Sequence, residues 1–196
     1  MLNTGDLEGR RSRDVYRIYE RLTEAGGLLP PAIGFIFDRE GRDERWRRDL
    51  ERESDDLVAF TPRRTYENYL LNPSAIAYVA SQIEGFREDG TISQEEVERW
   101  IEQQRWDNKY FQEPIEPSSR TQSLWLAEVD GAKLLKDLFG DLSENRVAYK
   151  KVLHGSLLTR WLCDEKPTEL EELASLIKQL LGGRGQESHY NEERRR

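Results

Sequence analysis

Short apolar runs alternate with helical patterns in the first third of the chain. Residues 11–25 place apolar side chains at helical spacing, at Val15, Ile18, Tyr19 and Leu22, so we expect a helix with Val15 and Ile18 in the core. Residues 32–37 form an apolar run rich in β-formers, which predicts a strand buried on both faces. The charged stretch 43–53 predicts an exposed helix, and residues 57–61 predict a second strand that ends at Pro62. The order helix, strand, helix, strand is typical of an α/β sheet.

From residue 66 onward the apolar positions keep helical spacing. Helix starts are marked by capping signals at Asn72, Ser93 and Thr168, and residues 113–119 predict a linker because they hold two prolines and two serines. We therefore expect an α/β fold: a partial parallel sheet with flanking helices, followed by an all-helical C-terminal region.

This pattern divides the chain into four parts. They are a flexible N-terminus at 1–9, an α/β portion at 10–72, a helical region at 73–182 and a disordered tail at 183–196. Two strands alone make a marginal sheet with open edges. The sheet is therefore expected to be covered by an upstream strand from a missing part of a longer protein, by another chain, or in part by the long helical region.

Composition narrows the class of protein. The 196 residues carry a net charge of −8, which argues against simple electrostatic capture of nucleic acid but is compatible with an enzyme that meets phosphates through a metal. No apolar run reaches the roughly 18 residues that a membrane span needs, so no membrane partner is expected. The single cysteine, Cys163, is interpreted as a buried structural thiol in a cytoplasmic, reducing compartment.

Acidic side chains follow the first predicted strand. Asp38 comes directly after it, Glu40 lies two residues further on, and Asp43 is a third carboxylate nearby. Carboxylates at positions i and i+2 of a turn can converge on one cation, and Mg²⁺ prefers oxygen ligands. The alternative is a polar turn in which Asp38 caps the next helix.

A second polar group follows the second strand. Arg63 and Arg64 stand close to Glu67 and Asn68, and two arginines there can hold a nucleic-acid phosphate and orient a carboxylate. The alternative is a capped helix start in which the next residues, Tyr69 to Leu71, belong to the core. The residues alone leave both interpretations open.

Taken together, the two groups resemble the Toprim domain of OLD-type (overcoming lysogenization defect) ATP-dependent endonucleases. The resemblance rests on the strand that ends in Asp38-x-Glu40 and on the segment Arg63-Arg64-x-x-Glu67-Asn68-Tyr69-Leu70-Leu71. Two further segments, Gly131–Leu135 and Tyr149–Gly155, also look like the helical tail of such proteins. The resemblance covers about residues 11–181.

The resemblance implies a divalent-metal-dependent nuclease that uses Mg²⁺ or Mn²⁺. Asp38 and Glu40 match the family's Asp-x-Asp pair, with glutamate in place of the second aspartate, and Glu67 matches the glutamate of Glu-Asn-Tyr. Lys133 is a candidate phosphate or transition-state contact, and its alternative is a solvated helix lysine. If the two strands are neighbours, Asp38, Glu40 and Glu67 should gather within about a nanometre, with Arg63 or Arg64 alongside. Alternatively, Glu67 forms an ion pair with Arg63 and stabilises the helix start.

Two parts of the family pattern are missing. Leu7-Glu8-Gly9 has the residues of the first Toprim motif but no preceding strand, and the chain has no phosphate loop, so no ATP site is expected in it. The expected partners are nucleic acid, above all DNA, and an AAA-type ATPase chain or a missing N-terminal part, and a homodimer stays open. The competing function is a non-catalytic, degenerate Toprim remnant that serves as a protein-interaction module.

Overall fold

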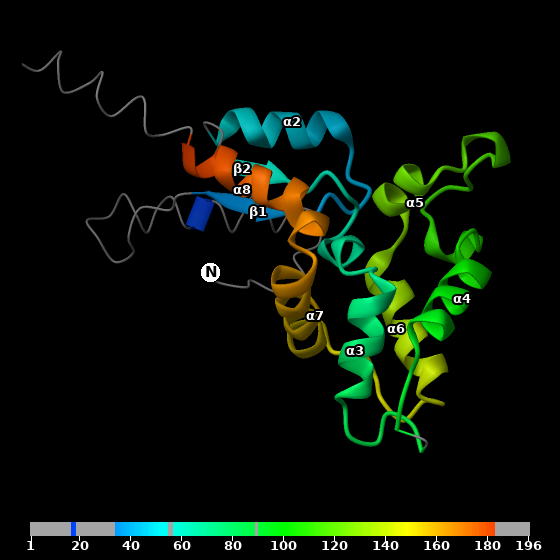
Figure 1. Ribbon diagram of the computed structural model, residues 1–196. Coiled ribbons are helices and arrows are strands. Elements are labelled where there is room, and N and C mark those ends of the chain that lie inside the picture. Colours follow the sequence, from blue (N-terminus) through cyan, green and yellow to red (C-terminus); the bar gives the residue numbers. More distant parts are fainter. Residues whose placement is uncertain (1–16, 19–33, 55–56, 89, 183–196) are drawn as a thin grey trace, which may run out of the picture. The chain divides into compact units, whose positions relative to one another are not determined.

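The structure is a computed structural model that describes residues 17–18, 34–54, 57–88 and 90–182 (Figure 1). In this part of the chain the fold is mixed α/β, mostly helical, with one small parallel sheet. The predicted N-terminal segment 1–9, the tail 183–196 and most of the predicted helix at 11–25 lie outside the described residues.

The chain forms two compact units. Unit 1 comprises residues 1–61 and 173–196, and unit 2 comprises residues 62–172. The sequence analysis instead places the change from sheet to helices after residue 72 and assigns residues 173–182 to the helical region.

Unit 1 contains the two predicted strands, β1 (Phe35–Phe37) and β2 (Val58–Phe60). They pair in parallel, with Phe35 opposite Val58 and Phe37 opposite Phe60, so the predicted parallel arrangement is confirmed. The connection between them contains α2 (Glu44–Glu53), the predicted charged helix. A strand, a crossover helix and a parallel strand form the elementary unit of an α/β sheet.

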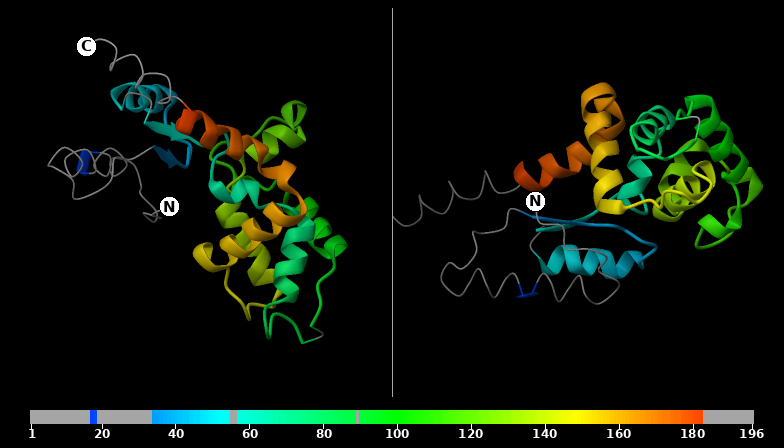
Figure 2. Two further views of the ribbon diagram at one scale, coloured as in Figure 1. Left: turned by 60° about the vertical axis from the view of Figure 1, so that its left-hand side comes forward. Right: turned by 90° about the horizontal axis from the view of Figure 1, so that it is seen from below.

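Helices cover both faces of this sheet. On one face Trp46 and Leu50 of α2 pack against Phe37 and Phe60, and the ring centroids of Trp46 and Phe60 are 5.8 Å apart. The other face meets α8 (Glu171–Gly182), because a side chain at Gly34 would contact the Leu180 side chain at 3.4 Å. Figure 2 shows α2 and α8 on opposite sides of the two strands.

Unit 2 is built from helices. Its α-helices are α3 (Pro73–Ser81), α4 (Gln94–Gln104), α5 (Gln122–Glu128), α6 (Gly131–Leu142) and α7 (Lys151–Glu165). Short 3-10 helices join them: η1 (Tyr66–Tyr69), η2 (Asn108–Tyr110), η3 (Pro117–Ser119) and η4 (Pro167–Leu170). Helix α3 packs against α4 and α7, and α6 packs against η1. The most deeply buried large side chains of this core are apolar or aromatic, among them Ile76, Tyr110, Trp125, Leu134, Leu138, Phe139 and Leu158.

Most of the predicted helix starts are confirmed. The Asn72 side chain accepts a hydrogen bond from the Ala75 amide at 3.1 Å, and Ser93 forms a reciprocal capping box with Glu96. The predicted cap at Thr168 is wrong. Residues 167–170 form the 3-10 helix η4, and α8 begins after it at Glu171.

Two predictions about burial are wrong. Cys163, expected to be a buried thiol, is exposed, because α7 turns His154, Leu158 and Leu162 inward and leaves Cys163 on its outer side. Ile18, expected in the core, is 58% exposed. None of the described helices is both long and apolar enough to span a membrane.

Candidate functional site

The carboxyl ends of β1 and β2 lie at one edge of the sheet in unit 1. Asp38 follows β1 directly, as predicted, and Thr61 follows β2. Two hydrogen bonds join these ends: the Thr61 amide donates to the Phe37 carbonyl at 2.9 Å, and the Arg39 amide donates to the Thr61 hydroxyl at 3.3 Å. The edge at which ligands bind to parallel sheets therefore carries the first candidate carboxylate.

The turn after Asp38 contains a residue in an unfavourable backbone conformation. Glu40 has φ of 47°, and Gly41 follows with φ of 64°. The left-handed region costs a non-glycine residue about 1–2 kcal/mol, and such strain concentrates at functional sites. The Glu40 carboxylate accepts a hydrogen bond from Arg42 Nη2 at 3.1 Å. Arg42 in turn lies over the Trp46 ring, which fixes the turn against α2.

Asp43 performs the capping role that the sequence analysis gives to Asp38 as an alternative. Its Oδ1 accepts a hydrogen bond from the Trp46 amide at 3.0 Å, so Asp43 is the N-cap of α2. The carboxylate proposed as a third metal ligand therefore already satisfies a helix end. Asp38 is left outside the helix, at the strand end.

In unit 2, Glu67 is a fully buried carboxylate. It lies in η1 with no exposed surface, and neither of its side-chain oxygens accepts a hydrogen bond from the described residues. Lys151 Nζ lies 3.4 Å from Glu67 Oε1 and supplies a positive charge. The expected alternative, an ion pair between Glu67 and Arg63, is therefore replaced by a pair with a lysine from the start of α7. A buried charge without hydrogen bonds is costly, so this pair only partly offsets the loss of water.

The Tyr149 ring lies in the same region of unit 2. Burial raises the pKa of its hydroxyl above the ordinary value, and the negative charge of Glu67 raises this pKa further. The hydroxyl oxygen is buried and has no hydrogen-bond partner among the described residues. A side chain at Gly155 would meet it at 3.2 Å, so glycine leaves room for the tyrosine.

Asn68, next to Glu67, has a structural role that its contacts explain. Its Oδ1 accepts hydrogen bonds from the Thr65 amide and hydroxyl and from the Gly131 amide. Its Nδ2 donates to the carbonyls of Leu126 and Val129, both at 2.8 Å. Gly131 is required for this approach, because a Cβ there would lie 2.6 Å from Asn68 Oδ1. Asn68 therefore fastens η1 to the turn between α5 and α6.

The two arginines predicted to contact nucleic acid make internal contacts. Arg63 donates to Glu172 Oε2 at 2.9 Å and to the Asn68 carbonyl at 3.1 Å, and its guanidinium lies 4.2 Å from the Tyr69 ring centroid. Arg64 Nη2 lies 3.6 Å from Asp130 Oδ2. Each arginine side chain is 17% exposed, so only a small part of each faces solvent.

Lys133 is also engaged within unit 2. Its Nζ donates a hydrogen bond to the Lys109 carbonyl at 2.9 Å, and its amide is capped by Asp130. Lys133 is exposed, and this contact links α6 to η2. Its role as a phosphate contact stays a prediction.

The predicted carboxylate set draws on both units. Asp38, Glu40 and Asp43 belong to unit 1, whereas Glu67 belongs to unit 2. Among the described residues no group of three His, Cys, Asp or Glu side chains is gathered as for a metal. That Asp38, Glu40 and Glu67 meet in one site therefore stays a prediction.

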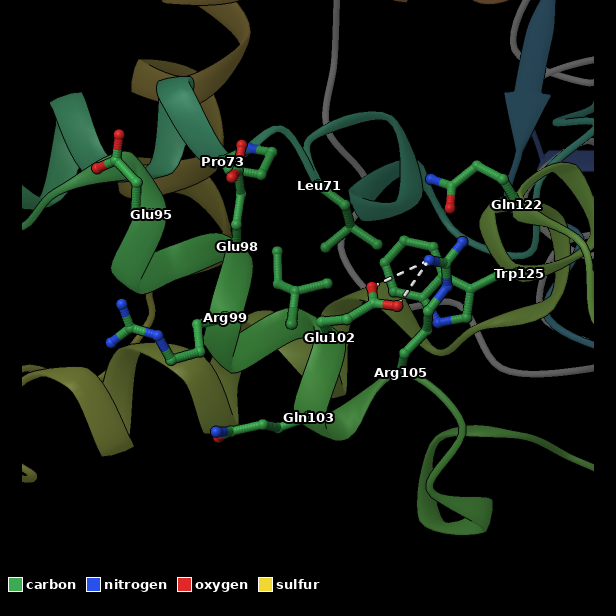
Figure 3. Close-up of a pocket in the computed structure, with 11 residues that line it drawn as sticks. Leu71, Pro73, Glu95, Glu98, Arg99, Glu102, Gln103, Arg105, Gln122 and Trp125 are labelled. Carbon is green, nitrogen blue, oxygen red and sulfur yellow. Dashed lines mark hydrogen bonds and ion pairs between the residues drawn. The ribbon is translucent and has the colours of Figure 1, made fainter.

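Unit 2 also contains a groove that the sequence analysis missed (Figure 3). Its volume is about 750 Å³, and apolar side chains form part of its lining: Leu71, Pro73, Ile101 and Trp125. On its rim Arg105 Nη1 donates to both carboxylate oxygens of Glu102, at 3.2 and 3.0 Å. The lining residues come from segments that are separated in the sequence, so no local sequence motif predicts the groove. Leu71 belongs to a segment that carries the Toprim resemblance, but none of the candidate catalytic, metal or nucleic-acid residues lines the groove.

No protein-family model, curated protein or solved structure matches this chain. The Toprim resemblance therefore rests on the sequence segments alone.

Proposed function

We propose that this chain is a divalent-metal-dependent nuclease that hydrolyses phosphodiester bonds in nucleic acid, and that Asp38 and Glu40 are metal ligands. The observation that carries the proposal is the parallel pairing of β1 with β2, which puts Asp38 at the carboxyl edge of a sheet. The left-handed conformation of Glu40, two residues after Asp38, adds support, because backbone strain of this kind is frequent at functional sites.

Carboxylate oxygens are the donor type that a hard divalent cation prefers. In unit 1 they belong to Asp38 and Glu40; in unit 2 Glu67 has two buried oxygens that accept no hydrogen bond from the described residues. When bound, Mg²⁺ or Mn²⁺ would stabilise the charge that develops on the phosphodiester and would lower the pKa of water. The protein's own contribution is the rigid strand end, which fixes the Asp38 backbone through the hydrogen bonds of Thr61.

As the Toprim part of an ATPase–nuclease system, the chain would act on DNA together with an AAA-type ATPase. This part of the proposal rests on the sequence resemblance. Such a system would serve defence against phage or repair.

The test is cleavage of plasmid DNA by the purified chain with Mg²⁺ or Mn²⁺, with and without a candidate ATPase chain. We expect nicking or linearisation that falls at least about 100-fold in Asp38→Asn, since a lost charge-stabilising group costs that much. Asp164→Asn, at an exposed position of α7, is the matched control and should retain activity. Equal cleavage by the wild type and Asp38→Asn would contradict the proposal.

A second candidate function is a non-catalytic interaction module. It is favoured by one specific observation: Arg63, Arg64 and Lys133 all make contacts within unit 2. Arg64→Ala separates the two functions. A nuclease should lose affinity for DNA and keep its affinity for Mn²⁺, whereas an interaction module should lose about 1 kcal/mol of stability and show no DNA binding to lose.

A further inference from the structure

Glu67 and Lys151 differ sharply in their freedom to move. Glu67 lies within η1 with no exposed surface, and the side chain of its neighbour Asn68 makes five hydrogen bonds to four residues. Lys151 is the first residue of α7, and its side chain is 40% exposed. A lysine ammonium on a flexible four-carbon chain can return to water. In this pair the carboxylate is fixed and the cation is exchangeable.

The environment of Glu67 favours a cation with more charge than an ammonium. Both carboxylate oxygens lack hydrogen bonds from the described residues, and Lys151 Nζ stands 3.4 Å from one of them. The Coulomb interaction grows with the charge of the cation and with exclusion of water. A divalent cation would use oxygens that Lys151 leaves without hydrogen bonds.

We infer that Lys151 is the built-in counter-ion of Glu67, and that a divalent cation binds Glu67 by displacing the Lys151 ammonium into solvent. Lys151 thus competes with the metal and sets the concentration at which Glu67 takes it up. This inference rests on the proposed function, because it assigns a metal to Glu67.

Substitution of Lys151 tests the competition, with the adjacent lysine as a matched control. Lys151→Met removes the competing charge and keeps an unbranched side chain, so calorimetry should show Mn²⁺ binding roughly tenfold tighter than in the wild type. Lys150→Met makes the same change in net charge one residue earlier, at an exposed position, and should shift the affinity less than about twofold.

Two further variants keep the test informative if Lys151→Met folds poorly. Lys151→Arg retains the charge and can hold the carboxylate through two parallel hydrogen bonds, so it should weaken Mn²⁺ binding. Melting temperature supplies a second readout: without metal Lys151→Met should melt below the wild type, and Mn²⁺ should raise its melting temperature more than that of the wild type.

The outcomes distinguish this inference from the proposed function. Tighter Mn²⁺ binding by Lys151→Met, lost again in the double variant with Glu67→Gln, supports the inference. Equal or weaker binding by Lys151→Met overturns it, while the proposed function survives if Asp38→Asn still reduces Mn²⁺ affinity. If neither the wild type nor any Lys151 variant binds Mn²⁺, both the inference and the proposed function are overturned.

Discussion

Units 1 and 2 both carry residues of the predicted site, but the two sets have different structural explanations. In unit 1, Asp38 and Glu40 stand at the end of a strand, and the left-handed conformation of Glu40 has an energetic cost. In unit 2, contacts within the fold explain most residues of the Glu-Asn-Tyr-Leu-Leu segment. Asn68 fastens two elements, Tyr69 packs under Arg63, and Leu70 is completely buried.

Glu67 is the exception in unit 2. It is as buried as its neighbours, but its carboxylate gains no hydrogen bond from the described residues. A motif can therefore combine residues that build the fold with one residue whose position costs stability. The Asn68 side chain, which helps build the fold, has satisfied hydrogen-bond partners, whereas the Glu67 carboxylate has none among the described residues.

The largest expected effect is the loss of the Asn68 side chain in unit 2. Asn68→Ala leaves the Leu126 and Val129 carbonyls and the Gly131 amide without their partner, and each such loss at a buried group costs about 1–3 kcal/mol. We expect chemical denaturation to show a loss of about 3–5 kcal/mol. Asn108→Ala, at an exposed position of η2, is the control and should cost less than about 1 kcal/mol. A similar loss of unfolding free energy in both variants would show that the Asn68 side-chain contacts do not stabilise the fold more than an exposed side chain does.

The next effect tests whether the two units unfold separately. Leu50 in unit 1 and Leu138 in unit 2 are both completely buried, and truncation of either to alanine should cost about 2–5 kcal/mol. Leu50→Ala should speed hydrogen exchange at the amides of β1 and β2 and leave the amides of α6 protected. Leu138→Ala should do the reverse. If each variant releases the amides of both units equally, the chain unfolds as one cooperative body.

A smaller effect is expected from relief of backbone strain. Glu40→Gly removes the left-handed penalty and the contact with Arg42, so stability should stay within about 1 kcal/mol of the wild type. Mn²⁺ affinity should nevertheless fall, because a proposed ligand is lost. Glu144→Gly in unit 2 is the matched control, since Glu144 also has a positive φ, of 54°. Unchanged Mn²⁺ affinity in Glu40→Gly would remove Glu40 from the proposed site.

The smallest effect concerns His154 of unit 2, which is buried and stacks on Phe139 with ring centroids 5.0 Å apart. Burial lowers the pKa of His154, and the nearby charge of Lys150 lowers it further. As the pH falls below about 6.5, His154 therefore binds a proton in the unfolded chain at a higher pH than in the folded chain. The stability that neutral His154 provides is complete above that pH and declines below it. Denaturation at about pH 7.5 and pH 5.5 should show this decline in the wild type and a smaller one in His154→Gln.

Much of the fold could be predicted because the local pattern was strong. The strands at 35–37 and 58–60 follow from short apolar runs ended by Asp38 and by Thr61-Pro62, and the helix starts at Asn72 and Ser93 follow from capping chemistry. The prediction failed at Thr168, where Pro167 starts a 3-10 helix ahead of α8.

The orientation of α7 could not be predicted from its sequence. Apolar residues occur all around this helix, and Val152, Leu153 and Leu157 stay exposed while Leu158 and Leu162 are buried. No single apolar stripe therefore fixes the buried face. The exposed position of Cys163 follows from packing with α3, which the sequence does not reveal.

The candidate site was predictable only where one element determines it. Asp38 at a strand end follows from the strand itself, whereas the partner of Glu67 comes from the distant helix α7. Arg63 was the nearer candidate by sequence, but Glu172 and the Tyr69 ring hold it. Long-range pairs of this kind depend on tertiary packing, which a single sequence pattern does not encode.

The most direct test of the central claim is a calorimetric titration of Mn²⁺ into the wild type, Asp38→Asn and the control Asp164→Asn. The account predicts that the wild type and Asp164→Asn bind Mn²⁺ alike, and that Asp38→Asn binds at least about tenfold more weakly. Circular dichroism should show that all three variants are folded. No Mn²⁺ binding by the wild type, or equal affinity in Asp38→Asn, would contradict the claim that the carboxyl edge of the sheet is a metal site.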